Sequence, residues 1–132
     1  MIRGTTAQFK FKLPYPKDQL QWITIHFWQP GNPNQGLPIC KNKNHCNEPI
    51  PQEICVSLTA EETKLFTDKY KAKVQLRAQP VALLGGTVFA STQQLITVYP
   101  MPDSLIDQDT AIESPDNTVV GDITSIDGGT II

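Results

Sequence analysis

The sequence has little cysteine, no long apolar run and no basic residue in its C-terminal part. Three cysteines among 132 residues are too few, and odd in number, for a fold held by a disulfide framework. No apolar run approaches the roughly 20 residues that a membrane helix needs, and residues 1–5 lack the apolar core of a signal peptide. We therefore expect a soluble protein with no membrane contact, made in the cytoplasm, that leaves the cell only as part of a larger particle.

Charge is distributed unevenly along the chain. All eleven Lys and Arg residues precede Pro100, whereas residues 100–132 hold seven of the thirteen acidic residues and no base. Residues 1–99 thus carry a net charge of +5 and residues 100–132 carry −7, although the whole chain has only −2. The split predicts a basic body and an acidic tail that contacts a partner.

A period of two dominates the first 99 residues, as expected for strands with one buried face. The alternating segments are residues 8–13, 22–28, 54–58 and 71–78. Gly85 and Gly86 give the best hairpin-turn signal, and apolar segments follow the turn at 88–90 and 95–99. Eleven prolines and eight glycines also suit a β-rich domain with many turns.

One short helix interrupts the strands. Thr59 and Glu62 have the spacing of a capping box, which predicts a helix or helical turn that ends near Phe66. Together with five to seven short strands, this favours an all-β fold over residues 1–99, an immunoglobulin-like β-sandwich. Residues 100–132 are expected to form an extended tail.

Residues 29–52 contain five prolines and predict an irregular arm without a continuous sheet ladder. Cys40, His45, Cys46 and Cys55 lie in or near it, so we considered a Cys₃His zinc site. The close CxxC pair of structural zinc sites is absent, and Cys55 alternates with core positions. A disulfide between Cys40 and Cys46 is a second alternative. Reduced cysteines, with no metal or cofactor, are the default expectation.

A catalytic pair of Cys and His, with His26 or His45 as the base, would also need an orienting group and an oxyanion site. The sequence carries no local signature for either. We therefore predict that the protein is not an enzyme, and a small hydrolase is our third hypothesis.

Two candidate contact surfaces follow from the outward faces of the strands. One is aromatic and contains Trp22, His26 and Trp28. The other is a basic stripe of Lys71, Lys73 and Arg77, and Lys10 and Lys12 are further members of this basic surface. Such residues could contact nucleic-acid phosphates and bases, but no nucleic-acid-binding motif accompanies them. We favour a solvated face or a surface for acidic protein.

The tail cannot bury enough apolar surface alone to offset its ordering entropy. Its β-branched residues suit pairing with a sheet edge or groove elsewhere, and the candidates for this contact are Val119, Val120, Ile123, Ile126, Ile131 and Ile132. Because tail and body have opposite charge, head-to-tail association between copies is a specific hypothesis.

Several short segments in this order resemble a known group of proteins: residues 1–6 with Phe9, Phe11, Leu13 and Pro14, residues 58–63 with Phe66, and residues 74–77 and 90–91 before 96–98. The chain resembles small immunoglobulin-like β-sandwich structural proteins of tailed bacteriophages, including the N-terminal domains of some upper baseplate proteins. The resemblance implies a virion component held by protein contacts, without cofactor or enzymatic activity.

Two functions are consistent with these patterns. The leading one is a bacteriophage virion structural protein, as a capsid auxiliary or decoration, connector or tail component, that binds neighbouring virion proteins through the arm and tail. The alternative is a soluble module that recognises carbohydrate or peptide through the aromatic strand face.

Overall fold

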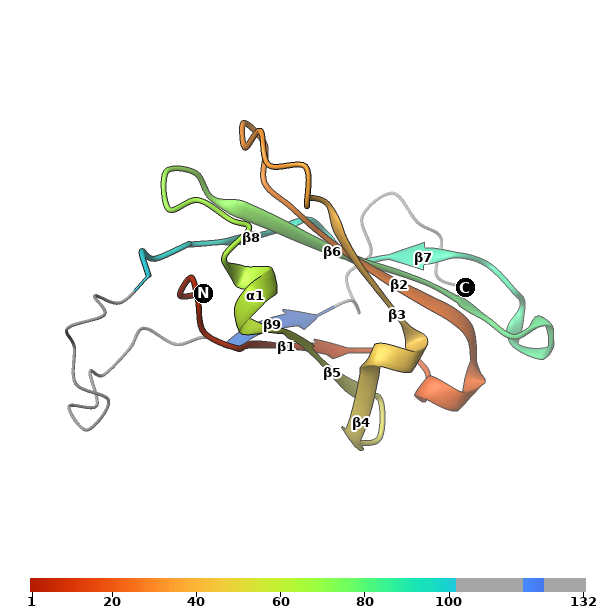
Figure 1. The fold of residues 1–132 in the computed structure, drawn as a ribbon. Coiled ribbons are helices and arrows are strands. Elements are labelled where there is room, and N and C mark those ends of the chain that lie inside the picture. Colours follow the sequence, from red (N-terminus) through yellow and green to blue (C-terminus); the bar gives the residue numbers. More distant parts are fainter. Residues whose placement is uncertain (102–117, 123–132) are drawn as a thin grey trace.

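The computed structural model describes residues 1–101 and 118–122, which form two β-sheets packed face to face (Figure 1). One sheet has the order β4-β5-β1-β9, with strands Cys46–Ile50, Glu53–Leu58, Ala7–Lys12 and Thr118–Asp122. The other has the order β3-β2-β6-β7, with β8 also paired to β6; its strands are Ile39–Asn42, Leu20–Trp28, Ala72–Pro80, Phe89–Ala90 and Gln94–Ile96. This architecture confirms the prediction of an all-β sandwich.

The core lies between the two sheets and follows from the alternation of the long strands. Every second residue of β1, β5 and β6 is buried, and so is every second residue of β2 from Ile23 to Phe27, after a register shift between Leu20 and Trp22. The residues between them point outward or lie at intermediate depth. Phe9 of β1 and Phe27 of β2 meet across the core, with ring centroids 4.8 Å apart and planes tilted by 56°. The predicted inward faces of these four strands are therefore confirmed.

The local signals for the helix and the hairpin are also confirmed. Helix α1 spans Ala60–Thr63, and Thr59 and Glu62 form both bonds of the capping box. The hairpin from β6 to β7 turns at Gly85 and Gly86, whose φ values of +102° and +66° favour glycine. Short 3₁₀ helices complete the connections: η1 at Lys17–Gln19, η2 at Lys43–His45 and η3 at Ala82–Leu84.

The prediction of an irregular arm over residues 29–52 is wrong, because β3 and β4 both lie within it. β3 pairs with β2, and β4 pairs with β5, so the segment crosses from one sheet to the other. Pro38 directly precedes β3, and Pro49 lies within β4. Both strands are at sheet edges, and on the open side of an edge strand there is no neighbouring strand whose hydrogen bond a proline could remove. With these two strands and β9, the expected number of five to seven strands was too low.

Candidate protein-binding surfaces

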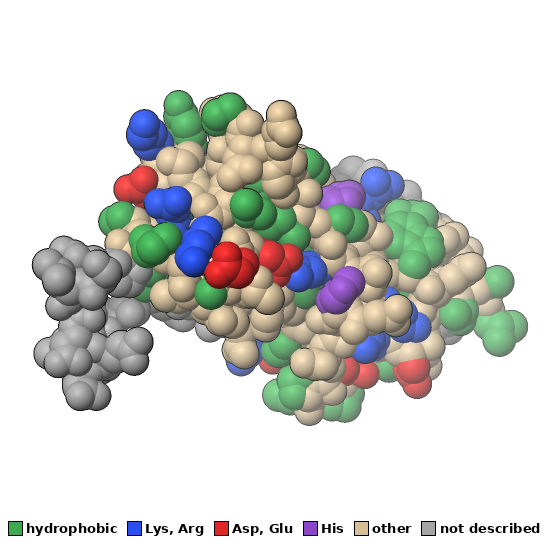
Figure 2. Space-filling view, viewed as in Figure 1, with side chains coloured by type: hydrophobic (Ala, Val, Ile, Leu, Met, Phe, Trp, Pro, Cys, Tyr) green, Lys and Arg blue, Asp and Glu red, His purple; other side chains and the backbone are tan. Residues whose placement is uncertain are grey.

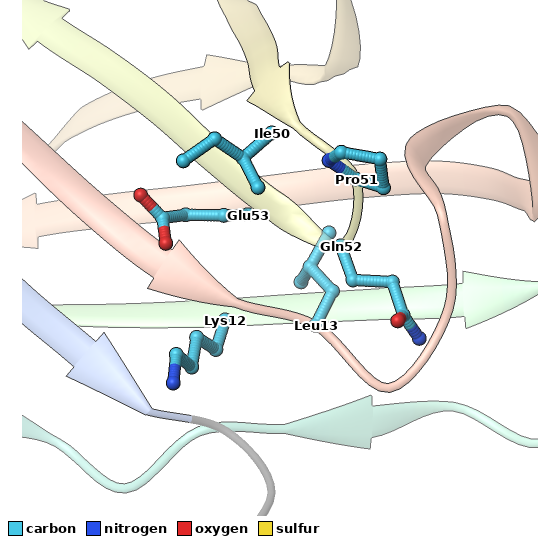
Figure 3. Close-up of a pocket in the computed structure, with 6 residues that line it drawn as sticks. All are labelled: Lys12, Leu13, Ile50, Pro51, Gln52 and Glu53. Carbon is cyan, nitrogen blue, oxygen red and sulfur yellow. The ribbon is translucent and has the colours of Figure 1, made fainter.

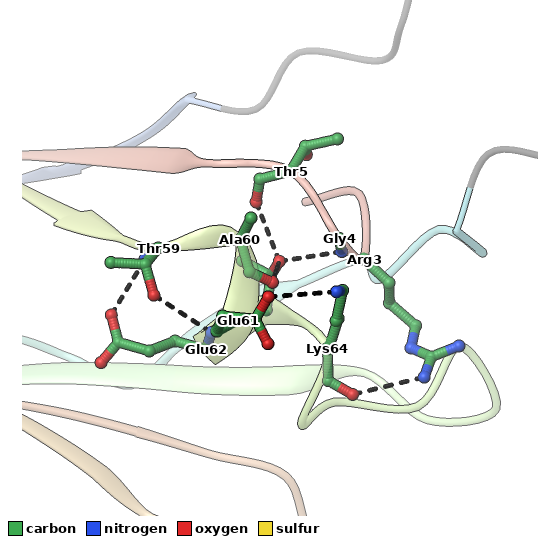
Figure 4. Close-up of polar contacts among 9 residues, drawn as sticks. Arg3, Gly4, Thr5, Thr59, Ala60, Glu61, Glu62 and Lys64 are labelled. Atoms are coloured by element: carbon green, nitrogen blue, oxygen red, sulfur yellow. Dashed lines mark hydrogen bonds and ion pairs between the residues drawn. The ribbon is translucent and has the colours of Figure 1, made fainter. Parts of the chain in front are cut away.

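The start of β1 is fixed by polar contacts with the segment around α1 (Figure 4). The buried Thr63 hydroxyl accepts a hydrogen bond from the Gly4 N–H at 3.0 Å and lies 2.8 Å from the Thr5 carbonyl, to which it can donate. The Arg3 guanidinium donates to the Lys64 carbonyl at 3.3 Å. These contacts hold the N-terminal segment against the helix and set the position at which β1 enters its sheet.

Along one edge, β1 pairs with β9 in parallel, in contrast to the antiparallel pairs of the other strands. The register runs from Gln8 opposite Thr118 to Lys12 opposite Asp122, and Val120 lies opposite Lys10. Of the tail residues predicted to pair with a sheet edge, Val119 and Val120 are in β9. The others, Ile123, Ile126, Ile131 and Ile132, lie outside the described residues.

The remaining sheet edges in the described part of the chain are short or interrupted. β3 has four residues after Pro38, and β4 has five with Pro49 inside it. Between β7 and β8 the edge breaks at Ser91, whose buried hydroxyl accepts the Leu76 N–H at 3.0 Å. β1 has six residues without proline, and β9 covers its side away from β5; left uncovered, a strand of this kind is a site for pairing with another chain. It is the edge to which the C-terminal segment adds a strand.

The outer face of the five-stranded sheet gathers most of the body residues that the sequence singled out. Trp22, His26 and Trp28 alternate with the buried residues of β2, and Lys73 and Arg77 do the same on β6. In the register of these strands, Trp28 lies opposite Lys73, and Thr24 lies between the aromatic positions opposite Arg77. The aromatic and basic surfaces are thus one mixed face, and the exposed Lys71 directly precedes β6.

The basic stripe as predicted is divided by the sandwich. Lys10 and Lys12 project from β1 on the outside of the four-stranded sheet, whereas Lys73 and Arg77 project from the opposite side of the molecule. The face in Figure 2 carries Lys and Arg side chains interspersed with acidic and hydrophobic ones, without a continuous basic patch.

A shallow hollow of about 370 Å³ lies on the outer face of the five-stranded sheet, lined by His26, Trp28, Pro38, Gln75 and Gln93. Sequence reasoning missed its last three residues because they come from neighbouring segments and meet only through the strand register. Trp22 is outside the hollow.

The indole N–H of Trp22 donates to the Gln79 side-chain oxygen at 2.8 Å, and the Gln79 amide donates to the Gly86 carbonyl at 2.6 Å. Trp22 is thereby engaged with the β6–β7 hairpin. The three outward residues of β2 therefore have two different roles: His26 and Trp28 line the hollow, and Trp22 supports a turn.

A second hollow, of about 420 Å³, lies where β1 ends beside the turn from β4 to β5 (Figure 3). Lys12 and Glu53 are register partners that line it, and Ile50, another lining residue, is 56% exposed. No sequence signal indicated this hollow, since it depends on β4, which was not predicted. Its position at the end of β1 also places it next to the end of β9.

The proposed zinc ligands are not gathered. Cys40 is exposed on β3 opposite His26, Cys46 is buried, and Cys55 faces outward from β5. The His45 Nδ1 accepts the Asn42 N–H at 3.1 Å. All three cysteines are free, and residues 1–101 with 118–122 contain no group of three side chains that could hold a metal ion.

The Cys46 thiol is also unsuited to chemistry as a thiolate. Burial raises its pKa to about 11, with Lys17 acting in the lowering direction and Cys55 in the raising direction. At neutral pH the thiol is therefore protonated, and a protonated thiol is a weak nucleophile and metal ligand.

No family model, no curated protein and no solved structure matches the chain. Within the two described ranges, no helix is long and apolar enough to span a membrane.

Proposed function

We propose that the chain is a structural protein of a tailed-phage virion, an immunoglobulin-like domain that binds neighbouring virion proteins through its C-terminal segment and the strands of residues 29–52. The observation that carries the proposal is the strand order. The orders β9-β1-β5-β4 and β3-β2-β6-β7 correspond to strands A-B-E-D and C′-C-F-G of the immunoglobulin fold. β9 takes the place of strand A, but it comes from the C-terminal segment and runs parallel to β1.

A strand supplied in this way suits attachment. Pairing at a sheet edge depends mainly on backbone hydrogen bonds, and it is a recurring mode by which folded domains bind extended segments. The opposite charges of residues 1–99 and 100–132 favour contact between the segment and a body of this kind. An extended segment also covers a large contact area on a neighbour, despite the entropy lost on ordering.

Purified particles from the cells that produce the protein test this proposal. We expect mass spectrometry to find the chain in gradient-purified particles at a fixed ratio to the main coat protein. A matched pair of variants, the full chain and a chain ending at Met101, should differ in incorporation. If the full chain occurs only in the soluble fraction of those cells, the proposal is wrong.

The hollow beside Trp28 supports the second candidate, a module that recognises carbohydrate or peptide. An aromatic ring with two glutamine side chains nearby offers stacking and hydrogen bonds to a polar ligand. Glycan-array and peptide-array binding that saturates, is lost in Trp28→Ala and is retained in Trp22→Ala would favour this function. Trp22 is the control because it lies outside the hollow.

A further inference from the structure

We propose that β9 is exchangeable: Thr118–Asp122 of one copy pairs with β1 of a second copy and links the chains. The inference rests on the proposed function and names one partner of the C-terminal segment, a further copy of the same chain. Three observations support it. The connection to β9 is long, the other sheet edges are short or interrupted, and β9 makes the same contacts with β1 whether the two strands belong to one chain or to two.

The connection to β9 is longer than pairing within one chain requires. Tyr99 forms a parallel bridge with Ile2, and Thr118 lies opposite Gln8, so six positions of the N-terminal segment separate the two contacts. At strand spacing these six positions span at most about 20 Å. The chain uses 19 residues from Tyr99 to Thr118, which reach about 65 Å when extended. This reach exceeds the size of a domain of 100 residues, whose radius of gyration is about 13 Å.

Within residues 1–101, β1 is the best acceptor for such a strand once its own β9 has left it. The edges at β3, β4 and β7–β8 are short, contain or follow proline, or are interrupted, whereas β1 is six residues long and unbroken. Each copy therefore has one donor strand, β9, and one acceptor edge, β1. Pairing between copies gives a reciprocal dimer, a closed ring or an open chain, depending on the rotation between neighbours.

Exchange also preserves the contacts that β9 makes. The same register, from Gln8 with Thr118 to Lys12 with Asp122, forms whether the two strands belong to one chain or to two. The balance between pairing within one chain and pairing between two chains therefore depends mainly on protein concentration. A strand tethered within its own chain has an effective concentration on the order of 1 mM. We expect monomers in dilute solution and exchanged chains where copies are concentrated, as they are in a particle.

Carbodiimide crosslinking of the full chain tests the exchange, because this reagent joins a lysine amine directly to a carboxylate. Lys12 has Glu53 opposite on one side and Asp122 opposite on the other. In an equal mixture of unlabelled and ¹⁵N-labelled chains, equilibrated by dilution from mild denaturant, a mixed-label Lys12–Asp122 product reports pairing between copies. The Lys12–Glu53 product is the internal control, since β1 and β5 pair within the body.

At protein concentrations near 1 mM about half of the pairs should join two copies, so we expect the mixed-label form to be about a quarter of the Lys12–Asp122 product. It should rise toward one half at higher concentration and fall toward zero on dilution by about 1,000-fold. Asp122→Asn should remove this product and leave the Lys12–Glu53 product unchanged.

Lys12–Asp122 product that carries one label at every concentration would overturn the exchange. So would the absence of this product, or mixed labels in the Lys12–Glu53 product, which indicate unspecific aggregation. Each of these results leaves the proposed function standing, because incorporation into particles is measured separately.

Discussion

The two sheets of the sandwich are assembled from differently distributed parts of the sequence. The five-stranded sheet uses segments between residues 20 and 96, and its central strands β2 and β6 are each nine residues long. The four-stranded sheet joins β1, near the N-terminus, to β9 at residues 118–122. Figure 1 shows β9 on the side of β1 away from β5.

The two sheets therefore differ in what determines their strand pairing. In the five-stranded sheet, a hairpin and long paired strands bury alternate side chains on the core, so the sheet is specified by its own residues. In the four-stranded sheet, the last strand is joined at an edge, where main-chain hydrogen bonds supply most of the affinity. Substitutions should therefore separate the stability of the body from the occupancy of the β1 edge.

The largest expected effect comes from the contact that joins both sheets. Phe27→Ala removes a fully buried ring that packs on Phe9, and we expect a loss of about 3–5 kcal/mol in the free energy of unfolding. Urea unfolding followed by tryptophan fluorescence measures it. Leu83→Ala, at a side chain that is 96% exposed, is the control and should stay within about 0.5 kcal/mol. A loss below about 1 kcal/mol for Phe27→Ala would contradict this account of the core.

A matched pair of polar substitutions compares the sheets directly. Thr63→Val leaves the Gly4 N–H without its acceptor, and Ser91→Ala does the same to the Leu76 N–H. Each is expected to cost about 1–3 kcal/mol, because both hydroxyls are buried. Hydrogen exchange should increase near residues 2–8 in the first variant and near residues 76 and 89–96 in the second. Identical exchange patterns would show that the two sheets do not open independently.

A double substitution, Val119→Pro with Val120→Pro, tests whether β9 occupies the β1 edge. Successive backbone N–H groups of a strand point to opposite sides, so one of the two prolines removes a donor that faces β1. We expect faster amide exchange in β1, little change in β6 and a loss of stability of about 1 kcal/mol. The matched control replaces both residues with Thr, which keeps the N–H groups and the β-branched shape. Unchanged exchange in β1 would mean that β9 does not protect this edge.

The smallest expected effect concerns a polar link between β3 and α1. The Lys41 amine on β3 lies 2.7 Å from the Glu62 carboxylate on α1. Burial raises the pKa of Glu62, but the hydrogen bonds and charge of Lys41 and the hydrogen bonds to Thr59 outweigh it, so the pKa lies below its ordinary value of 4.5. The stabilisation is therefore complete above pH 4.5 and is lost as the pH falls through the lower pKa of the folded state.

Glu62→Gln keeps an acceptor for the capping box and removes the charge. We expect a loss below about 1 kcal/mol at pH 7 and a weaker dependence of stability on pH below 4.5. Glu61→Gln is the control, because Glu61 is 84% exposed and pairs with Lys64 on the surface. Urea unfolding at several pH values measures both variants, and equal acid dependence in the two would exclude Glu62 as the titrating group.

Much of the body could be predicted from the sequence because local patterns determine it. Alternation gave the buried faces of β1, β2, β5 and β6, and the spacing of Thr59 and Glu62 gave the start of α1. β3 and β4 could not be found this way. They are short edge strands among prolines, and their pairing depends on β2 and β5 rather than on a pattern of their own.

The candidate surfaces were predicted only in part, for the same reason. Alternation places Trp28 and Lys73 outward, but only the register puts them opposite each other. It likewise brings Pro38 and Gln75 to one hollow. Tail composition indicated pairing with a sheet edge, yet neither the choice of β1 nor the parallel direction can be read from composition. The hollow at Lys12 and Ile50 depends on the unpredicted strand β4.

The parallel direction of β9 has a mechanical consequence. The N-terminal end of β1 and the C-terminal end of β9 lie at opposite ends of the pair, so tension between them acts across all the register pairs from Gln8 with Thr118 to Lys12 with Asp122 together, in shear. Strand pairs loaded in this way must break their hydrogen bonds collectively, whereas peeling from one end breaks them in sequence. The β1–β9 contact is therefore weak toward sideways peeling and strong toward pulling along the strand.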